Sequence, residues 1–161
     1  MVNFNDVKQN YPRPTSTNSA QARADLYNAL GGEWPTLINN PNYANTCAIR
    51  LSIAIRKSGI EIPSQYKEAQ DGAGNTIILK VKTLKNFIES QIGTPFWGIS
   101  KQPGQPIGSN TLPSVKGIIV YHVAWADATG HFDLWNGNDF VGNGNFSDIQ
   151  DGYHLAVWKL N

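Results

Sequence analysis

The chain has 161 residues, a formal net charge of +1 and a charged fraction of 16%, below the value of about 25% that is typical of globular proteins. This balance, without any block rich in Lys and Arg, argues against nucleic acid as a partner and favours a substrate that is neutral or carries both charges. The length predicts one domain over residues 1–161, and the single cysteine, Cys47, excludes an internal disulfide.

The amino-terminal sequence MVNFNDVKQNYPRPTS has no basic region followed by an apolar run, so it does not resemble an ordinary secretory signal. No apolar run approaches the ~18 residues that a membrane span needs, and we therefore expect no membrane insertion. The sequence predicts a soluble protein that is made in the cytoplasm and would need another route of export.

Helices are predicted first along the chain. A short helix is expected over residues 4–10, and Pro12 ends it. Ser19 is the expected N-cap of a second helix that continues to Leu30, where a pair of glycines stops it.

The segment NTCAIRLSIAI, residues 45–55, predicts a third helix that begins at or just before Cys47, with Asn45 or Thr46 as the N-cap. Basic residues in the last turn and Gly59 just beyond it are typical of a helix end. Because this helix is apolar on most of its sides, we expect it to be central in the domain.

Strands are predicted mainly in the second half. A short strand at 77–81 and a helix at 82–92 precede a loop rich in Pro and Gly, from Gly93 to Pro113. Longer strands are expected at 117–125, 131–135 and 153–160, and a segment around 140–146 could pair back onto them. This order predicts an α+β fold with N-terminal helices packed on an antiparallel sheet.

Cys47 is the candidate nucleophile. At the first turn of a helix, the free N–H groups and the positive end of the helix dipole stabilise a thiolate and can also hold an oxyanion. The alternative is a small buried core residue, since free cysteine is among the most buried residue types.

His131 leads the three histidines as the candidate base for that nucleophile. It opens a predicted strand in which Asp133 and Trp135 share its face, so polar groups gather on one side. His122 lies in mid-strand and is interpreted as a core or edge residue, and His154 is a weaker rival.

A third residue should accept a hydrogen bond from the imidazole and orient it. The sequence favours Asn143 slightly over Asp139, whereas Asp133 is expected to lie beside the ring rather than behind it. Arg50, Trp135 and Asp133 are candidate substrate contacts, although a structural salt bridge is the more favoured role of Arg50. No H-E-x-x-H motif or cysteine pair supports a metal site, and no cofactor is expected.

NTCAIRLSIAI, KGIIVYHVAWADATGHFDLWNG and the closing AVWKL together resemble the type VI secretion amidase effector 4 family. The resemblance covers most of the chain from Gly31 onward. It implies a papain-like, NlpC-type cysteine peptidase fold in which Cys47 matches the family nucleophile and His131 the family base.

The resemblance also implies a substrate and partners. Such effectors cut the peptidoglycan stem peptide between D-glutamate and meso-diaminopimelate, after the type VI secretion apparatus has delivered them to the periplasm of recipient bacteria. A cognate periplasmic immunity protein protects the producer.

One segment departs from the family pattern. Where the family often has two cysteines bracketing a catalytic aspartate, this chain has NDFVGNGNF, and the ungapped position of the aspartate is Gly142. Two other functions remain open: a deamidase or transglutaminase acting on protein through the same dyad, and a non-catalytic cell-wall-binding or interaction module.

Overall fold

A computed structural model describes residues 2–123 and 130–161. Within these ranges the α-helices are α1 (Phe4–Asn10), α2 (Ser19–Leu30), α3 (Cys47–Lys57) and α4 (Val81–Ile92). The strands are β1 (Ala69–Gln70), β2 (Thr76–Ile77), β3 (Trp97–Ser100), β4 (Gly117–His122), β5 (Gly130–Trp135) and β6 (His154–Lys159). Short 3-10 turns lie at Trp34–Leu37, Pro41–Tyr43, Ser64–Tyr66 and Phe146–Asp148. The predicted α+β class is confirmed.

The larger sheet has the strand order β3-β6-β4-β5, and each neighbouring pair is antiparallel. Among the described residues β5 is therefore an edge strand, and beyond it an isolated bridge links Trp135 to Phe140. The alternation predicted for β5 is confirmed, because Phe132 and Leu134 pack into the core beneath the helices while Trp135 packs on the opposite face.

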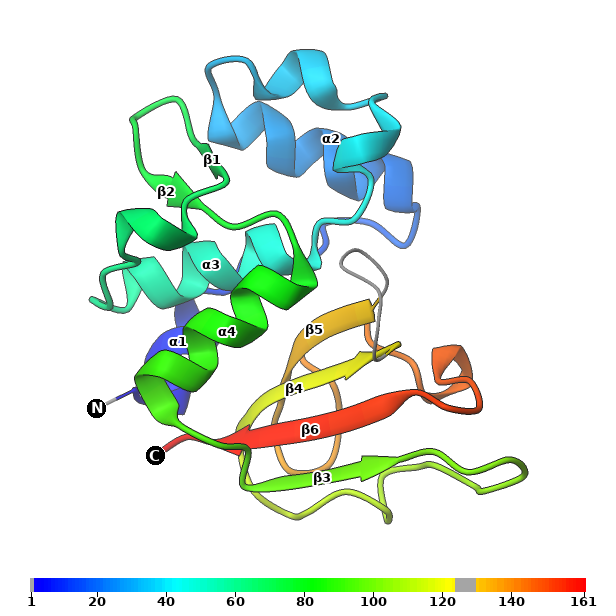
Figure 1. The fold of residues 1–161 in the computed structure, drawn as a ribbon. Coiled ribbons are helices and arrows are strands. Elements are labelled where there is room, and N and C mark those ends of the chain that lie inside the picture. Colours follow the sequence, from blue (N-terminus) through cyan, green and yellow to red (C-terminus); the bar gives the residue numbers. More distant parts are fainter. Residues whose placement is uncertain (1, 124–129) are drawn as a thin grey trace.

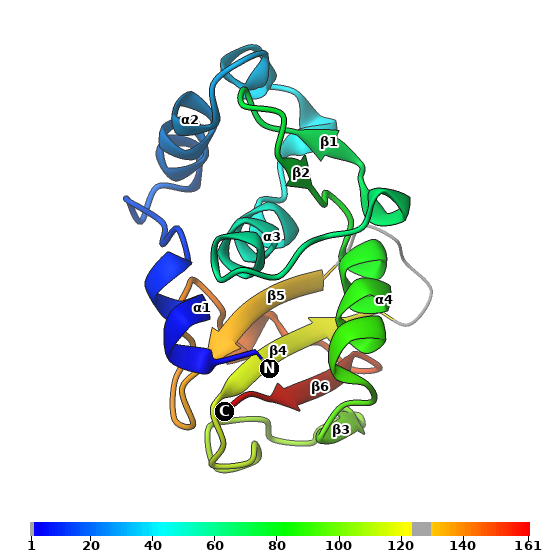
Figure 2. The ribbon, with the colours of Figure 1, turned by 90° about the vertical axis from the view of Figure 1, so that its left-hand side faces the viewer.

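The helices α1, α3 and α4 lie over one face of this sheet, and α2 and the small β1–β2 hairpin lie farther from it (Figures 1 and 2). α3 is central, as predicted: residues 47–55 are all buried, between the sheet on one side and α2 and the hairpin on the other. Burial on this scale fixes the position of the helix, and with it the position of its first residue.

Three local predictions are corrected. The strand expected at 77–81 ends at Ile77, because α4 already begins at Val81. β3 lies inside the segment expected to be a loop; its four residues carry no clear alternation, and it forms because β6 offers a free backbone edge. The N-cap of α2 is Asn18, whose side chain accepts the Gln21 N–H.

Residues 126–129 of the predicted turn, and the end of the strand predicted to reach Trp125, lie outside the described residues. In the part of the chain that is described, no helix is long and apolar enough to cross a membrane.

Candidate active site

Cys47 is the first residue of α3, where the sequence places it. Thr46 occupies the N-cap position without a side-chain cap, and the Cys47 N–H instead donates to Asn45 Oδ1 at 3.1 Å. The same Asn45 amide donates through Nδ2 to the carbonyl of Gly130 at 3.2 Å, and Cys47 Sγ lies 3.8 Å from that carbonyl. Asn45 thus joins the start of α3 to the start of β5 and fixes the thiol between them.

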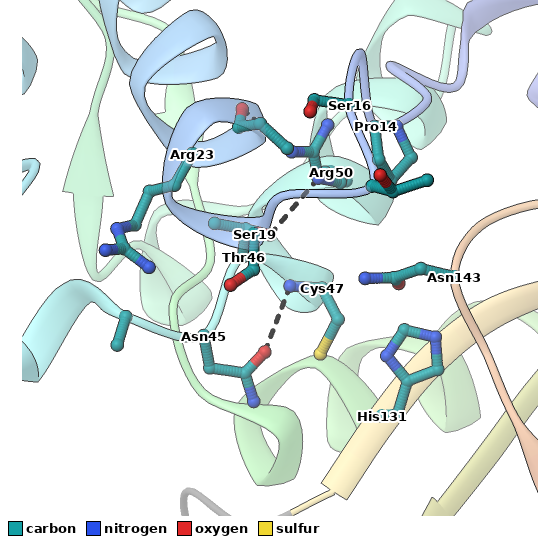
Figure 3. Close-up of a pocket in the computed structure, with 13 residues that line it drawn as sticks. Pro14, Ser16, Ser19, Arg23, Asn45, Thr46, Cys47, Arg50, His131 and Asn143 are labelled. Carbon is teal, nitrogen blue, oxygen red and sulfur yellow. Dashed lines mark hydrogen bonds between the residues drawn. The ribbon is translucent and has the colours of Figure 1, made fainter.

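The imidazole of His131 lies beside this thiol, with one ring nitrogen facing the sulfur (Figure 3). The other, Nε2, is 2.8 Å from Oδ2 of Asp133. Burial alone would lower the pKa of His131, but hydrogen bonds to Asp133 and Cys47 and the negative charges of both outweigh it and raise the pKa to about 9. The imidazolium is therefore the favoured form of this ring at neutral pH.

The partner of the imidazole is Asp133, and among the described residues neither Asn143 nor Asp139, the choices made from the sequence, is hydrogen-bonded to His131. Residues 131 and 133 point to the same face of β5, and the ring presents Nε2 rather than Nδ1 to the carboxylate. Nε2 is the farther nitrogen from the backbone, which places the carboxylate behind the ring as seen from Cys47. Asp133 is fully buried and does not line the cavity, so it is not placed as a substrate contact.

Asn143 and Asp139 have other surroundings. Asn143 is exposed, and its side chain points toward Cys47 from above the imidazole (Figure 3). Asp139 is exposed in the turn after β5, where its N–H donates to Asn136 Oδ1 at 2.8 Å. Only the first of these two residues lines the cavity at Cys47.

Trp135 and Arg50 also differ from expectation. Trp135 is fully buried and donates its indole N–H to the Pro113 carbonyl at 3.0 Å, away from the cavity. Arg50 is buried but forms no salt bridge with any described residue. Its three nitrogens donate to Thr46 Oγ1 and to the carbonyls of Pro12 and Ala22, at 3.1, 2.7 and 3.3 Å. This guanidinium therefore ties α3 to α2 and to the segment after α1.

A cavity of about 200 Å³ opens in front of the thiol (Figure 3). Its described lining comprises Pro14, Ser16, Thr17, Ser19, Ala22, Arg23, Ala44, Asn45, Thr46, Cys47, Arg50, His131 and Asn143. None of these is Asp or Glu and two are Arg, so the cavity favours an anionic or carboxylate-bearing ligand.

The sequence did not indicate that residues on and near α2 line this cavity. Ser19 and Arg23 on α2, and Ser16 just before it, line the cavity because α2 lies against α3 in the folded chain, a contact that no local sequence pattern indicates. The glycine pair at 142 and 144 was a visible signal, but without a strand–glycine–helix context it predicted nothing specific.

The other two histidines lie elsewhere. His122 and His154 face each other across β4 and β6, with ring centroids 5.8 Å apart, and His154 Nδ1 is 2.7 Å from Ser100 Oγ. Among the described residues no group of three or more His, Cys, Asp and Glu side chains could hold a metal ion.

The chain is similar to known proteins in sequence and in fold. A family model described as Tae4, type VI secretion system (T6SS) amidase effector protein 4, matches residues 43–158. No curated protein matches the sequence significantly.

Solved structures are similar over the whole chain. The type VI effector Tae4 from Enterobacter cloacae has a TM-score of 0.76 and 24% identity, and the alignment covers 100% of this chain and 98% of that one. The Tae4 of the Tae4–Tai4 effector–immunity complex from Salmonella Typhimurium has a TM-score of 0.79 and 21% identity, with 100% and 99% covered. These likenesses establish the fold, and the family match, which spans most of the chain, shows that the protein belongs to the type VI secretion amidase effector protein 4 family.

Proposed function

We propose that this amidase effector hydrolyses the bond between D-glutamate and meso-diaminopimelate in the peptidoglycan stem peptide, through a thiol mechanism. One observation carries the proposal: the thiol at the start of α3 faces an imidazole whose far nitrogen is hydrogen-bonded to a buried carboxylate. Nucleophile, base and orienting group are thus arranged as in papain-like enzymes, whose fold class we propose for the chain.

The chemistry follows from this arrangement. Cys47 thiolate attacks the carbonyl carbon of the scissile amide, and the His131 imidazolium donates its proton to the leaving amine. The neutral imidazole then takes a proton from water, which attacks the thioester and frees the acid. Asp133 is a positioning residue, because it touches the imidazole and not the reacting atoms.

The oxyanion needs donors that point into the cavity. The Cys47 N–H is the natural first donor, but it is already held by Asn45 Oδ1, so the substrate oxygen must compete with that side chain. The Asn143 side chain points toward the same space (Figure 3). We assign its amide as a second donor, which gives this residue a role in place of orienting His131.

The charge of the cavity supports the substrate class. The bond between D-glutamate and diaminopimelate is flanked by carboxylates, and the described lining holds two guanidinium groups and no carboxylate. Arg50 has all three nitrogens bonded within the protein, so it contributes mainly positive potential. Arg23 bonds through Nε to the Ile38 carbonyl at 2.8 Å; its terminal nitrogens have no partner among the described residues and can contact a substrate carboxylate.

The family also supports a route and a partner. Relatives from Enterobacter cloacae and Salmonella Typhimurium were crystallised with the immunity protein Tai4. We propose that this chain is likewise delivered by a type VI secretion apparatus to the periplasm of recipient bacteria. There it acts on peptidoglycan, and a cognate immunity protein neutralises it in the producer's own periplasm.

The test is digestion of purified diaminopimelate-type muropeptides, read by mass spectrometry. The wild-type protein and Lys57→Ala, an exposed change at the far end of α3, should both cut between D-glutamate and diaminopimelate, and Cys47→Ala should not. Cleavage that survives in Cys47→Ala would exclude the thiol mechanism. Ammonia release from protein glutamine, without muropeptide cleavage, would point instead to a deamidase.

A further inference from the structure

The carboxylate of Asp133 is held by four donors, although its residue lies on an edge strand. Oδ1 accepts the N–H groups of Leu134 at 2.8 Å and Gly142 at 2.7 Å. Oδ2 accepts the N–H of Gly144 at 2.8 Å and faces His131 Nε2 at 2.8 Å. The segment 142–144 therefore does not continue the ladder with β5 but turns its amides onto this side chain.

Gly142 is a glycine for reasons of space and not of backbone conformation. Its φ lies outside the left-handed region that favours glycine. A Cβ built on it would lie 2.8 and 3.0 Å from the two carboxylate oxygens of Asp133, and 2.7 Å from Tyr11 Oη. The Asp133 carboxylate thus fills the volume that a side chain at position 142 would otherwise occupy.

We propose that positions 133 and 142 share one carboxylate site behind His131, which either residue can supply if the other leaves the space free. In this chain Asp133 supplies the carboxylate, and the lack of a side chain at Gly142 leaves room for it. An aspartate at 142 would project its carboxylate one bond beyond that Cβ, into the same volume. There it could accept the Gly144 N–H as an Asx turn and face Nε2 of the imidazole.

The surroundings of the site suit either arrangement. Tyr11 is buried beside it, with a hydroxyl that has no hydrogen-bond partner among the described residues, so this phenol can donate to a carboxylate that arrives from the 142 side. The backbone of residues 142–144 already brings its donors to this point. A relocated carboxylate therefore needs no new element of structure.

The test is a relocation series: Asp133→Ala, Gly142→Asp and the double variant Asp133→Ala/Gly142→Asp. The substrate-independent readout is the pH titration of the His131 ring by NMR. Asp133→Ala should move this titration to lower pH, and the double variant should move it back up by more than half of the shift. A folded double variant that titrates like Asp133→Ala would overturn the proposal.

Hydrolysis of muropeptides is the second readout, and it rests on the proposed function. The double variant should recover at least about a tenth of the wild-type rate, against a loss of about 100-fold or more in Asp133→Ala. If wild-type protein cuts no muropeptide, the proposed function fails, yet the titration still decides the shared site. Recovery of the titration without recovery of hydrolysis would limit the exchange to ring orientation and would contradict its use in catalysis.

A double-mutant cycle in stability covers the case in which the relocated aspartate prevents folding. Gly142→Ala should lower the melting temperature strongly in the wild type, because its Cβ meets a buried carboxylate. It should do so less in Asp133→Ala, where the two carboxylate oxygens no longer meet that Cβ and the Tyr11 hydroxyl is the close contact that remains. Gly108→Ala is the matched control, since its Cβ would meet nothing within 4 Å and its φ is not left-handed. Equal losses in both backgrounds would show that the two positions do not share a site.

Discussion

The two sides of the site are built in different ways. Cys47 begins a helix whose residues 47–55 are all buried, so its position follows from the whole core. His131 and Asp133 lie on an edge strand, and a loop of two glycines and one asparagine completes their surroundings. The helix thus places the nucleophile mainly by packing, supported by the hydrogen bonds of Asn45 and Arg50, whereas the imidazole is oriented by its contact to a single carboxylate.

Loss of the imidazole should have the largest effect, since both sides of the site meet in it. His131→Ala removes the proton donor and acceptor, and we expect muropeptide hydrolysis to fall by about 1,000-fold or more. Steady-state kinetics on purified muropeptides would measure this loss. His122→Ala, on β4 and away from the cavity, is the control, and an equal loss there would contradict the assignment of His131.

Neutralising the carboxylate should break the strand side and leave the helix side intact. Asp133→Asn keeps the shape but removes the charge that supports the imidazolium, so kcat should fall by about 100-fold or more while the thiol stays in place. Steady-state kinetics on muropeptides would measure kcat for Asp133→Asn and for the control variant Asp139→Asn. Full activity in Asp133→Asn, or a comparable loss in Asp139→Asn, would show that the orienting residue has been misidentified.

Arg50→Ala should disrupt the helix side of the site, and its main effect should be a loss of protein stability. The change leaves the buried carbonyl of Ala22 and the partly buried carbonyl of Pro12 without the guanidinium donor, which should cost about 2–4 kcal/mol of unfolding free energy. Urea unfolding of this variant, beside the exposed change Arg13→Ala, measures the difference. A loss no larger than that of Arg13→Ala would mean that the guanidinium does not hold the segments together.

The smallest effect is a dependence of stability on pH. The pKa of His131 is raised in the folded protein to about 9, from an ordinary value of 6.5. Its contribution to stability is therefore fully present below about pH 6.5 and is lost as the pH rises through 9. We expect the stability difference between wild type and Asp133→Asn to shrink over this window, as measured by melting temperature. A difference that grows with pH would have the wrong sign.

The helix side was accessible from sequence for a physical reason. The polar residues before Cys47 and Gly59 after the last turn mark the two ends of the helix that contains NTCAIRLSIAI. Its apolar sides predict that it is buried. The alternation that places His131 and Asp133 on one face is equally local. These patterns therefore sufficed for the positions of the thiol and the imidazole.

The third residue depended on geometry that no pattern contains. Whether a side chain two residues along a strand lies beside or behind an imidazole depends on the ring rotamer and on which nitrogen faces the thiol. The resemblance placed an aspartate at Gly142, and the structure puts the carboxylate of Asp133 at that point in space. The sequence thus contained both Asp133 and Gly142, but the contact between them forms only in the folded chain.

The most direct measurement of the central claim is the titration of the His131 ring by NMR in wild type, Asp133→Asn and Asn143→Ala. If Asp133 is the group that holds the imidazolium, wild type and Asn143→Ala should titrate near pH 9, and Asp133→Asn should titrate well below it. If Asn143→Ala lowers the titration and Asp133→Asn does not, the carboxylate on β5 is not the orienting group, and the account of the site is wrong.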